Sequence, residues 1–261
     1  MTMLMDESMQ RICREAADVY VTHTGVAFIG LVVHGSAVKG GVIPGWSDID
    51  FQLYLEDEAV DESGRLPLSL GLAIHRDLAR IDPAPYQYIQ TRVLTPSFPQ
   101  FGGLVPHTYR LLRGRMLLPD LTENQLRERA FRFLSGLNPA ALFPANCLLD
   151  HGDDRLQKEV RAFGTAVWPA LFHFLSAQPD NRALDIWALT KTEAMELVPA
   201  QSPIGGSIRR FKSAVLGLTP DRASVEQVLM VVEAGMEFLN EVAARWSVEG
   251  RQGERAGIAP Q

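Results

Sequence analysis

The periodicity of the apolar residues changes near residue 120, and this change divides the chain into two kinds of structure. Before it, residues 26–33 form a short apolar run typical of a buried strand, and residues 48–55 alternate apolar with polar side chains. After it, apolar residues recur at helical spacing. The sequence therefore predicts an α/β (α+β) fold class, with a small mixed-sheet domain followed by an all-helical bundle.

The predicted boundaries follow from this pattern and from the positions of glycine and proline. In the first part we expect a helix from about Met5 that ends at Gly25, a helix over residues 66–80, and a third strand over 86–94. The helices expected after residue 120 span 122–135, 154–177, 181–198, 205–216 and 221–247. Pro169 should kink or interrupt the second of them. We divide the chain into domains 1–120 and 121–249 and a loose polar tail, 250–261.

Charge and cysteine content narrow the class of partner. The 25 Lys and Arg residues face 31 Asp and Glu residues, giving a net charge of -6, and no basic stripe suggests a duplex nucleic acid partner. Cys13 and Cys147 lie far apart in sequence, without the spacing of a zinc site or a disulfide framework, so a reducing cytoplasm is expected. Residues 26–33 are the longest apolar stretch and are too short to span a membrane.

The chemistry is concentrated in His34-Gly35-Ser36, followed after eleven residues by Asp48-Ile49-Asp50-Phe51. Residues i and i+2 of a strand point to the same side, so Asp48 and Asp50 should present their carboxylates together, on a polar face opposite the core. Mg²⁺ prefers such oxygen ligands together with substrate phosphates. Gly35 and Ser36 suit a phosphate-binding turn, which Lys39 or Ser47 would assist.

An apolar strand, Gly-Ser, a short spacer and then Asp-apolar-Asp-apolar together resemble the signature of the nucleotidyltransferase superfamily related to DNA polymerase beta. The resemblance implies transfer of AMP from ATP to a hydroxyl of a small molecule, with Mg²⁺ as cofactor. It implies that Asp48 and Asp50 are the metal-binding and catalytic residues and that Gly35 and Ser36 bind the nucleotide. The sequence leaves the oligomeric state open.

A second stretch, Lys191-Thr192-Glu193-Ala194 followed by Leu197-Val198-Pro199, is similar to part of the C-terminal domain of aminoglycoside adenylyltransferases. This resemblance implies that Lys191 meets the nucleotide phosphates and that the acceptor is an aminoglycoside-like antibiotic, which would make the protein a resistance enzyme. A solvated surface lysine is the alternative for Lys191.

One element of the superfamily pattern is not found in the sequence. Its members usually have a third carboxylate on a following strand, but neither face of the strand expected over residues 86–91 offers an acid. A carboxylate from elsewhere in the chain would then have to take this role, and the candidates are Glu193, Asp185 and Asp82. The alternatives are a regulatory protein that binds nucleotide without efficient turnover, and an enzyme that nucleotidylates a protein.

Overall fold

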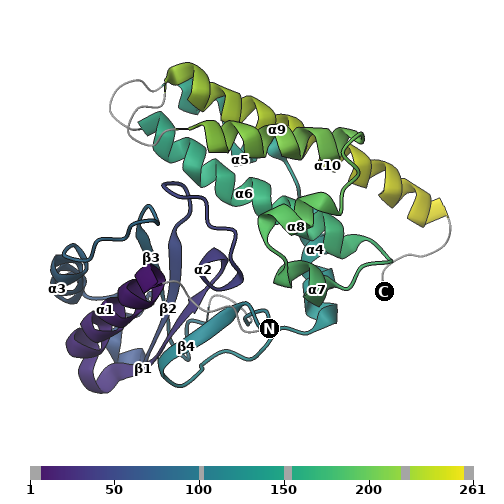
Figure 1. The fold of residues 1–261 in the computed structure, drawn as a ribbon. Helices are drawn as coiled ribbons and strands as arrows, with labels where there is room; N and C mark the ends of the chain where they lie inside the picture. Colours follow the sequence, from purple (N-terminus) through teal and green to yellow (C-terminus); the bar gives the residue numbers. More distant parts are fainter. Residues whose placement is uncertain (1–6, 100–102, 150–154, 219–223, 256–261) are drawn as a thin grey trace. The chain divides into compact units, whose positions relative to one another are not determined.

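The computed structural model describes residues 7–99, 103–149, 155–218 and 224–255 (Figure 1). The chain divides into two compact units, Met1–Thr122 and Glu123–Gln261, which we call the N-terminal unit and the helical unit. Among the helices of the described residues, none combines the length and the apolar character that a membrane crossing requires.

The N-terminal unit is built on a four-stranded mixed sheet in the order β3-β2-β1-β4. Strands β1 (Phe28–His34) and β2 (Ile49–Leu55) are antiparallel, β2 is parallel to β3 (Ile89–Leu94), and β1 is antiparallel to β4 (Tyr109–Gly114). The sequence analysis does not predict β4. This edge strand has the sequence Tyr-Arg-Leu-Leu-Arg-Gly, and neither of its faces is buried. Its residues therefore do not alternate between apolar and polar, which is the pattern that predicts a strand.

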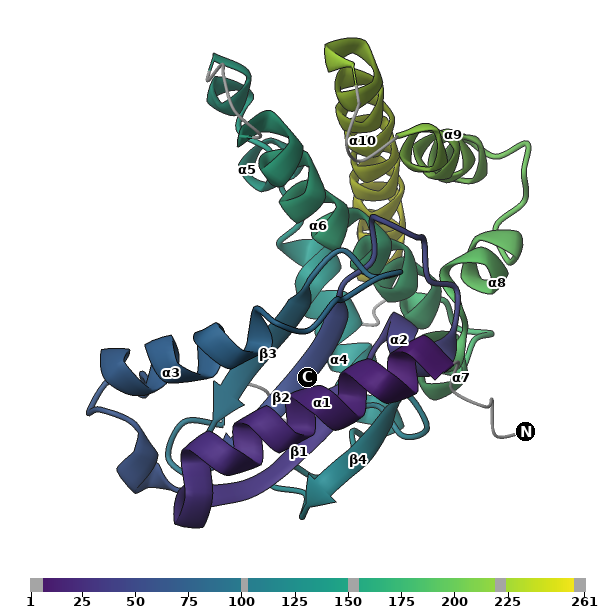
Figure 2. The same cartoon turned by 60° about the vertical axis from the view of Figure 1, so that its left-hand side comes forward.

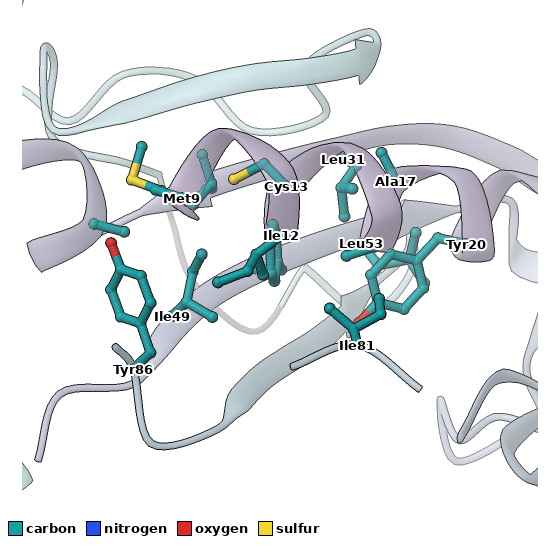
Figure 3. Close-up of a cluster of buried hydrophobic side chains, with 14 of the residues drawn as sticks. Met9, Ile12, Cys13, Ala17, Tyr20, Leu31, Ile49, Leu53, Ile81 and Tyr86 are labelled. Carbon is teal, nitrogen blue, oxygen red and sulfur yellow. The ribbon is translucent and has the colours of Figure 1, made fainter. Parts of the chain in front are cut away.

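Helices complete the N-terminal unit. They are α1 (Glu7–Thr24), α2 (Ser36–Lys39) and α3 (Leu68–Leu78), with short 3-10 turns η1 (Gly25–Ala27) and η2 (Asp57–Ala59). The apolar stripe of α1 packs on the sheet through Met9, Ile12 and Cys13, as Figures 2 and 3 show. Burial raises the pKa of the Cys13 thiol to about 12, so this cysteine stays protonated. Met5, expected on the same stripe, lies outside the described residues.

The core side of β2 agrees with the sequence pattern, but its opposite side does not. Ile49, Phe51, Leu53 and Leu55 all join the cluster beneath α1 and α3. The expectation of a polar opposite face is wrong for Gln52 and Tyr54, which are 4% and 0% exposed. Tyr54 belongs to a second apolar cluster that includes Leu104 and Leu118, and its hydroxyl donates to Gln52 Oε1 at 2.8 Å. Asp48 and Asp50, at the start of β2, remain half-buried.

The helical unit contains two short helical segments that the sequence analysis does not predict. Its elements are α4 (Glu123–Ser135), α5 (Pro139–Leu142), η3 (Ala145–Leu149), α6 (Arg155–Ala177), α7 (Ala183–Ala188), α8 (Lys191–Glu196), α9 (Pro203–Gly217) and α10 (Val225–Arg255). The unexpected ones are α5 and η3, which lie between α4 and α6.

Three sequence expectations for the helical unit differ from the structure. The helix predicted over 181–198 is two helices, because the Thr190 side chain caps α8 in a capping box with Glu193. Helix α6 runs from Arg155 to Ala177 through Pro169, so the interruption expected there does not occur, since the buried residues around it hold the helix in the core, while a kink at Pro169 stays a prediction. Helix α10 continues through residues 250–255, which the sequence analysis assigns to a loose tail, because an established helix adds residues at little cost. Residues 256–261 of that tail lie outside the described residues.

Candidate active site

A tight turn leads from β1 into α2. Gly35 has φ +74° and ψ -144°, a conformation that side-chain-bearing residues rarely adopt. Its carbonyl accepts hydrogen bonds from the Val38 and Lys39 amides, and its own amide donates to the Thr108 carbonyl at 3.2 Å. Ser36 is the first residue of α2, and the first amides of a helix have no acceptor within it. The turn therefore presents backbone donors beside the end of the strand.

Two aspartates lie next to this turn, on the neighbouring strand. Asp50 pairs across the sheet with His34, and Asp48 immediately precedes β2, which begins one residue later than predicted. A Cβ atom placed on Gly35 would lie 3.0 Å from Asp50 Oδ2. The turn and the carboxylate therefore lie close together, and a side chain at position 35 would crowd Asp50.

We expect Gly35→Ala to disturb both the turn and Asp50. The substitution forces a Cβ into a conformation that costs about 1–3 kcal/mol for residues other than glycine, and it presses that Cβ against Asp50 Oδ2. The expected result is a lower unfolding temperature and weaker ATP binding, measured by calorimetry.

The matched control is Gly71→Ala in α3. Gly71 has open space around its Cβ position and does not have a positive φ, so alanine should raise helix stability by about 0.5–1 kcal/mol. Equal behaviour of the two variants would contradict the role assigned to Gly35.

Strand β3 brings a third polar side chain to the aspartates. It runs parallel to β2, with Gln90 in register with Asp50 and Ile89 with Ile49. The Gln90 amide satisfies both acids when its nitrogen faces them, 2.8 Å from Asp48 Oδ2 and 3.2 Å from Asp50 Oδ1. The Tyr88 hydroxyl donates to Asp48 Oδ2 at 3.2 Å.

Sequence reasoning missed Gln90 because it searched this strand for an acid. The feature of the sequence that could have identified Gln90 is its position in the two-residue alternation of the strand. A polar residue in the strand beside the aspartates, on the face opposite the buried core, lies within reach of their carboxylates.

His34 lies on the same side of the sheet as Asp50, directly across from it. Burial, and then the positive charge of Arg92, lower the pKa of His34 to about 4. The imidazole is therefore neutral at pH 7, so His34 offers hydrogen bonds to a bound group but no positive charge.

The remaining predicted residues of the N-terminal unit have different surroundings. The Ser47 hydroxyl is buried and accepts a hydrogen bond from the Ile43 amide at 2.9 Å, so it holds the turn before β2. Lys39 is the last residue of α2, one turn from Gly35. Asp82 accepts a hydrogen bond from the Ala84 amide within its own loop.

The helical unit holds the other predicted residues. Lys191 is the first residue of α8, and its Nζ lies 5.7 Å from the centre of the Trp168 ring. Glu193 accepts hydrogen bonds from the Thr190 amide and hydroxyl, and Asp185 forms an exposed ion pair with Arg182. Each of the two acids therefore has a local structural partner. The role of Lys191 at the nucleotide phosphates stays a prediction.

The side chains beside the Gly35 turn determine which metal ligands the site can supply. Within the described residues, no group of three or more histidine, cysteine, aspartate or glutamate side chains is placed to hold a metal ion. Beside the turn, the candidate metal ligands are therefore the carboxylates of Asp48 and Asp50, and the neutral amide of Gln90 lies between them.

Comparison with known proteins bears on the fold. No protein-family model matches the sequence, and no curated protein matches it. Among solved structures, the chain is similar to spectinomycin adenyltransferase AAD(9) from Enterococcus faecialis, a structure determined with ATP and spectinomycin. The sequences are 15% identical, the match covers 88% of this chain and 99% of that one, and the TM-score is 0.52. The chain therefore has the fold of that adenyltransferase, which confirms the fold class expected from the sequence.

Proposed function

We propose that the protein is an adenylyltransferase that moves AMP from ATP to a hydroxyl of a small molecule and requires Mg²⁺. The observation that carries the proposal is the closeness of the Gly35 turn to Asp50, whose Oδ2 would lie 3.0 Å from a Cβ on Gly35, with Asp48 two residues away. A backbone turn able to donate to phosphates and a pair of carboxylates able to hold a cation are thereby joined in one place.

The residues present fit a magnesium ion that arrives with a nucleotide. Mg²⁺ is commonly held by one or two carboxylates, with substrate phosphates and water completing its coordination. Asp48 and Asp50 supply two carboxylates, and a turn without a side chain at Gly35 leaves the backbone amides that follow it close to them. When bound, Mg²⁺ would neutralise phosphate charge in the transition state.

The chain's own residues supply mainly position and charge to this reaction. Asp48 and Asp50 would orient the triphosphate through the cation, while the amides at Ser36 would hold phosphate oxygens. The acceptor oxygen would form a bond to the α-phosphorus as the bond to the pyrophosphate leaving group breaks, and the hydroxyl proton would pass to water.

The acceptor class is proposed from the likeness to an adenyltransferase whose structure contains spectinomycin. An acidic chain with a net charge of -6 is compatible with a cationic, hydroxylated antibiotic. In this proposal, the N-terminal unit binds the nucleotide and the helical unit binds the acceptor. The biological outcome would be antibiotic resistance. Because ATP is the donor and both cysteines are free thiols, we place the reaction in the cytoplasm.

The test combines binding with turnover. Calorimetry with ATP and Mg²⁺ should show binding to the full chain, and mass spectrometry should show an AMP adduct on one member of a panel of aminoglycosides and spectinomycin. No heat of binding for any nucleotide would overturn the proposal. A labelled protein with no labelled small molecule would point instead to a protein-nucleotidylating enzyme.

A second function is favoured by one specific observation. Gln90 occupies the strand position beside Asp50, and no third acid joins the pair within the described residues. This arrangement suits a regulatory protein that binds nucleotide without efficient turnover. Binding of ATP and Mg²⁺ with no product on any acceptor would support it.

A further inference from the structure

One side-chain amide connects both members of the acid pair. When the Gln90 amide is oriented to satisfy both acids, its nitrogen lies 2.8 Å from Asp48 Oδ2 and 3.2 Å from Asp50 Oδ1, and it has two hydrogens to donate to the two carboxylates. Two neighbouring carboxylates repel one another, so without a shared donor they would turn apart. The amide opposes that repulsion and holds both groups toward the same point.

The backbone fixes Gln90 in this position. The parallel pairing of β3 with β2 places it in register with Asp50, while Ile89 pairs with the fully buried Ile49. Tyr88, which immediately precedes β3, has a hydroxyl that donates to the same Asp48 oxygen. The contacts of the two aspartates with Gln90 and Tyr88 thus come from the first residues of β3 and the residue before it, which position the acids before any ligand arrives.

The amide differs from a carboxylate in charge although it has the same shape. A glutamate at this position would bring the site to three negative charges and add oxygen ligands for a cation, whereas glutamine adds a donor and no charge. With two carboxylates alone, the attraction for a free divalent cation is smaller, and the phosphates of a nucleotide must supply further ligands.

We propose that Gln90 is a positioning residue that holds Asp48 and Asp50 together and keeps the site weak for free divalent cations, so that the metal enters with the triphosphate. This inference rests on the proposed function, because it concerns the same site. In this protein, metal binding and nucleotide binding are then strongly coupled, and the uncharged side chain of Gln90 sets that coupling.

The experiment measures Mn²⁺ binding to the full chain by electron paramagnetic resonance, with and without ATP. The parent protein should bind Mn²⁺ weakly alone and more tightly with ATP. Gln90→Glu should bind free Mn²⁺ at least about tenfold more tightly, and Gln90→Leu should bind Mn²⁺ with ATP about tenfold more weakly, the scale of effects for side chains that orient metal ligands. Gln10→Leu, an exposed glutamine on α1, is the matched control and should match the parent.

The outcomes separate the inference from the proposed function. If the parent fails to bind Mn²⁺ with ATP, both the proposed function and this inference are overturned. If the parent binds it and Gln90→Leu binds equally well, only the inference is overturned. Should Gln90→Leu fail to fold, as judged by circular dichroism, Gln90→Glu decides the question, because an unchanged affinity for free Mn²⁺ contradicts the proposal.

Discussion

Replacing Asp50 with asparagine is expected to lower nucleotidyl transfer about a thousandfold, because a cation lost from a transferring phosphoryl group removes roughly 4 kcal/mol of transition-state stabilisation. Asparagine keeps the size of the side chain and an oxygen that can accept from Gln90, so the neighbouring contacts are preserved. Folding should therefore be nearly unchanged while the negative charge disappears. The measurement is the rate of AMP transfer to the acceptor found in the panel, at saturating ATP and Mg²⁺.

Asp18→Asn is the matched control for this prediction. Asp18 lies on α1, its side chain is 69% exposed, and its nearest cation, Arg113, is 3.9 Å away. An exposed pair at that distance contributes little to stability, so the control should retain the activity of the parent. A variant Asp50→Asn with activity within a few-fold of the parent would remove Asp50 from the metal-binding role.

The largest stability loss is expected from Phe211→Ala in the helical unit. Phe211 is 0% exposed on α9, and its ring packs edge-on against Trp168 of α6 at a centroid distance of 5.5 Å. Removing a buried phenylalanine side chain costs about 3–5 kcal/mol, because apolar contacts are lost and a cavity remains. The unfolding transition, followed by tryptophan fluorescence and circular dichroism, should shift to markedly lower temperature.

Phe131→Ala provides the comparison for Phe211. Phe131 lies on α4, is 46% exposed, and its ring is tilted against that of Trp246 with centroids 5.3 Å apart. Its loss should cost about 1 kcal/mol, the scale of an aromatic pair at a partly exposed position. Similar shifts for the two variants would mean that Phe211 does not anchor the packing of α9 on α6.

The limits of the sequence analysis are clearest in the N-terminal unit. The alternation over residues 48–55 correctly predicts which side chains of β2 face α1, because a strand has a strict two-residue period. The same alternation wrongly predicts a polar opposite face. Gln52 and Tyr54 are both buried, and Tyr54 packs in a cluster with Leu104 and Leu118, which lie far away in sequence. No local pattern reports such a covering segment.

The helical unit shows a different limit. Apolar spacing alone predicts one helix over residues 181–198, but Thr190 begins a second helix by bonding the amide of Glu193. The capping box was readable as Thr-x-x-Glu, yet the periodicity on either side concealed it.

The class of fold and the pairing of Asp48 with Asp50 follow from the residue pattern, because strand and helix periods and the two-residue spacing of these acids are local properties. The folded structure was needed to show that Gln90 lies within reach of both acids and that Gly35 lies beside Asp50. Those contacts depend on the register between separate strands, which is set by how distant parts of the chain pack together.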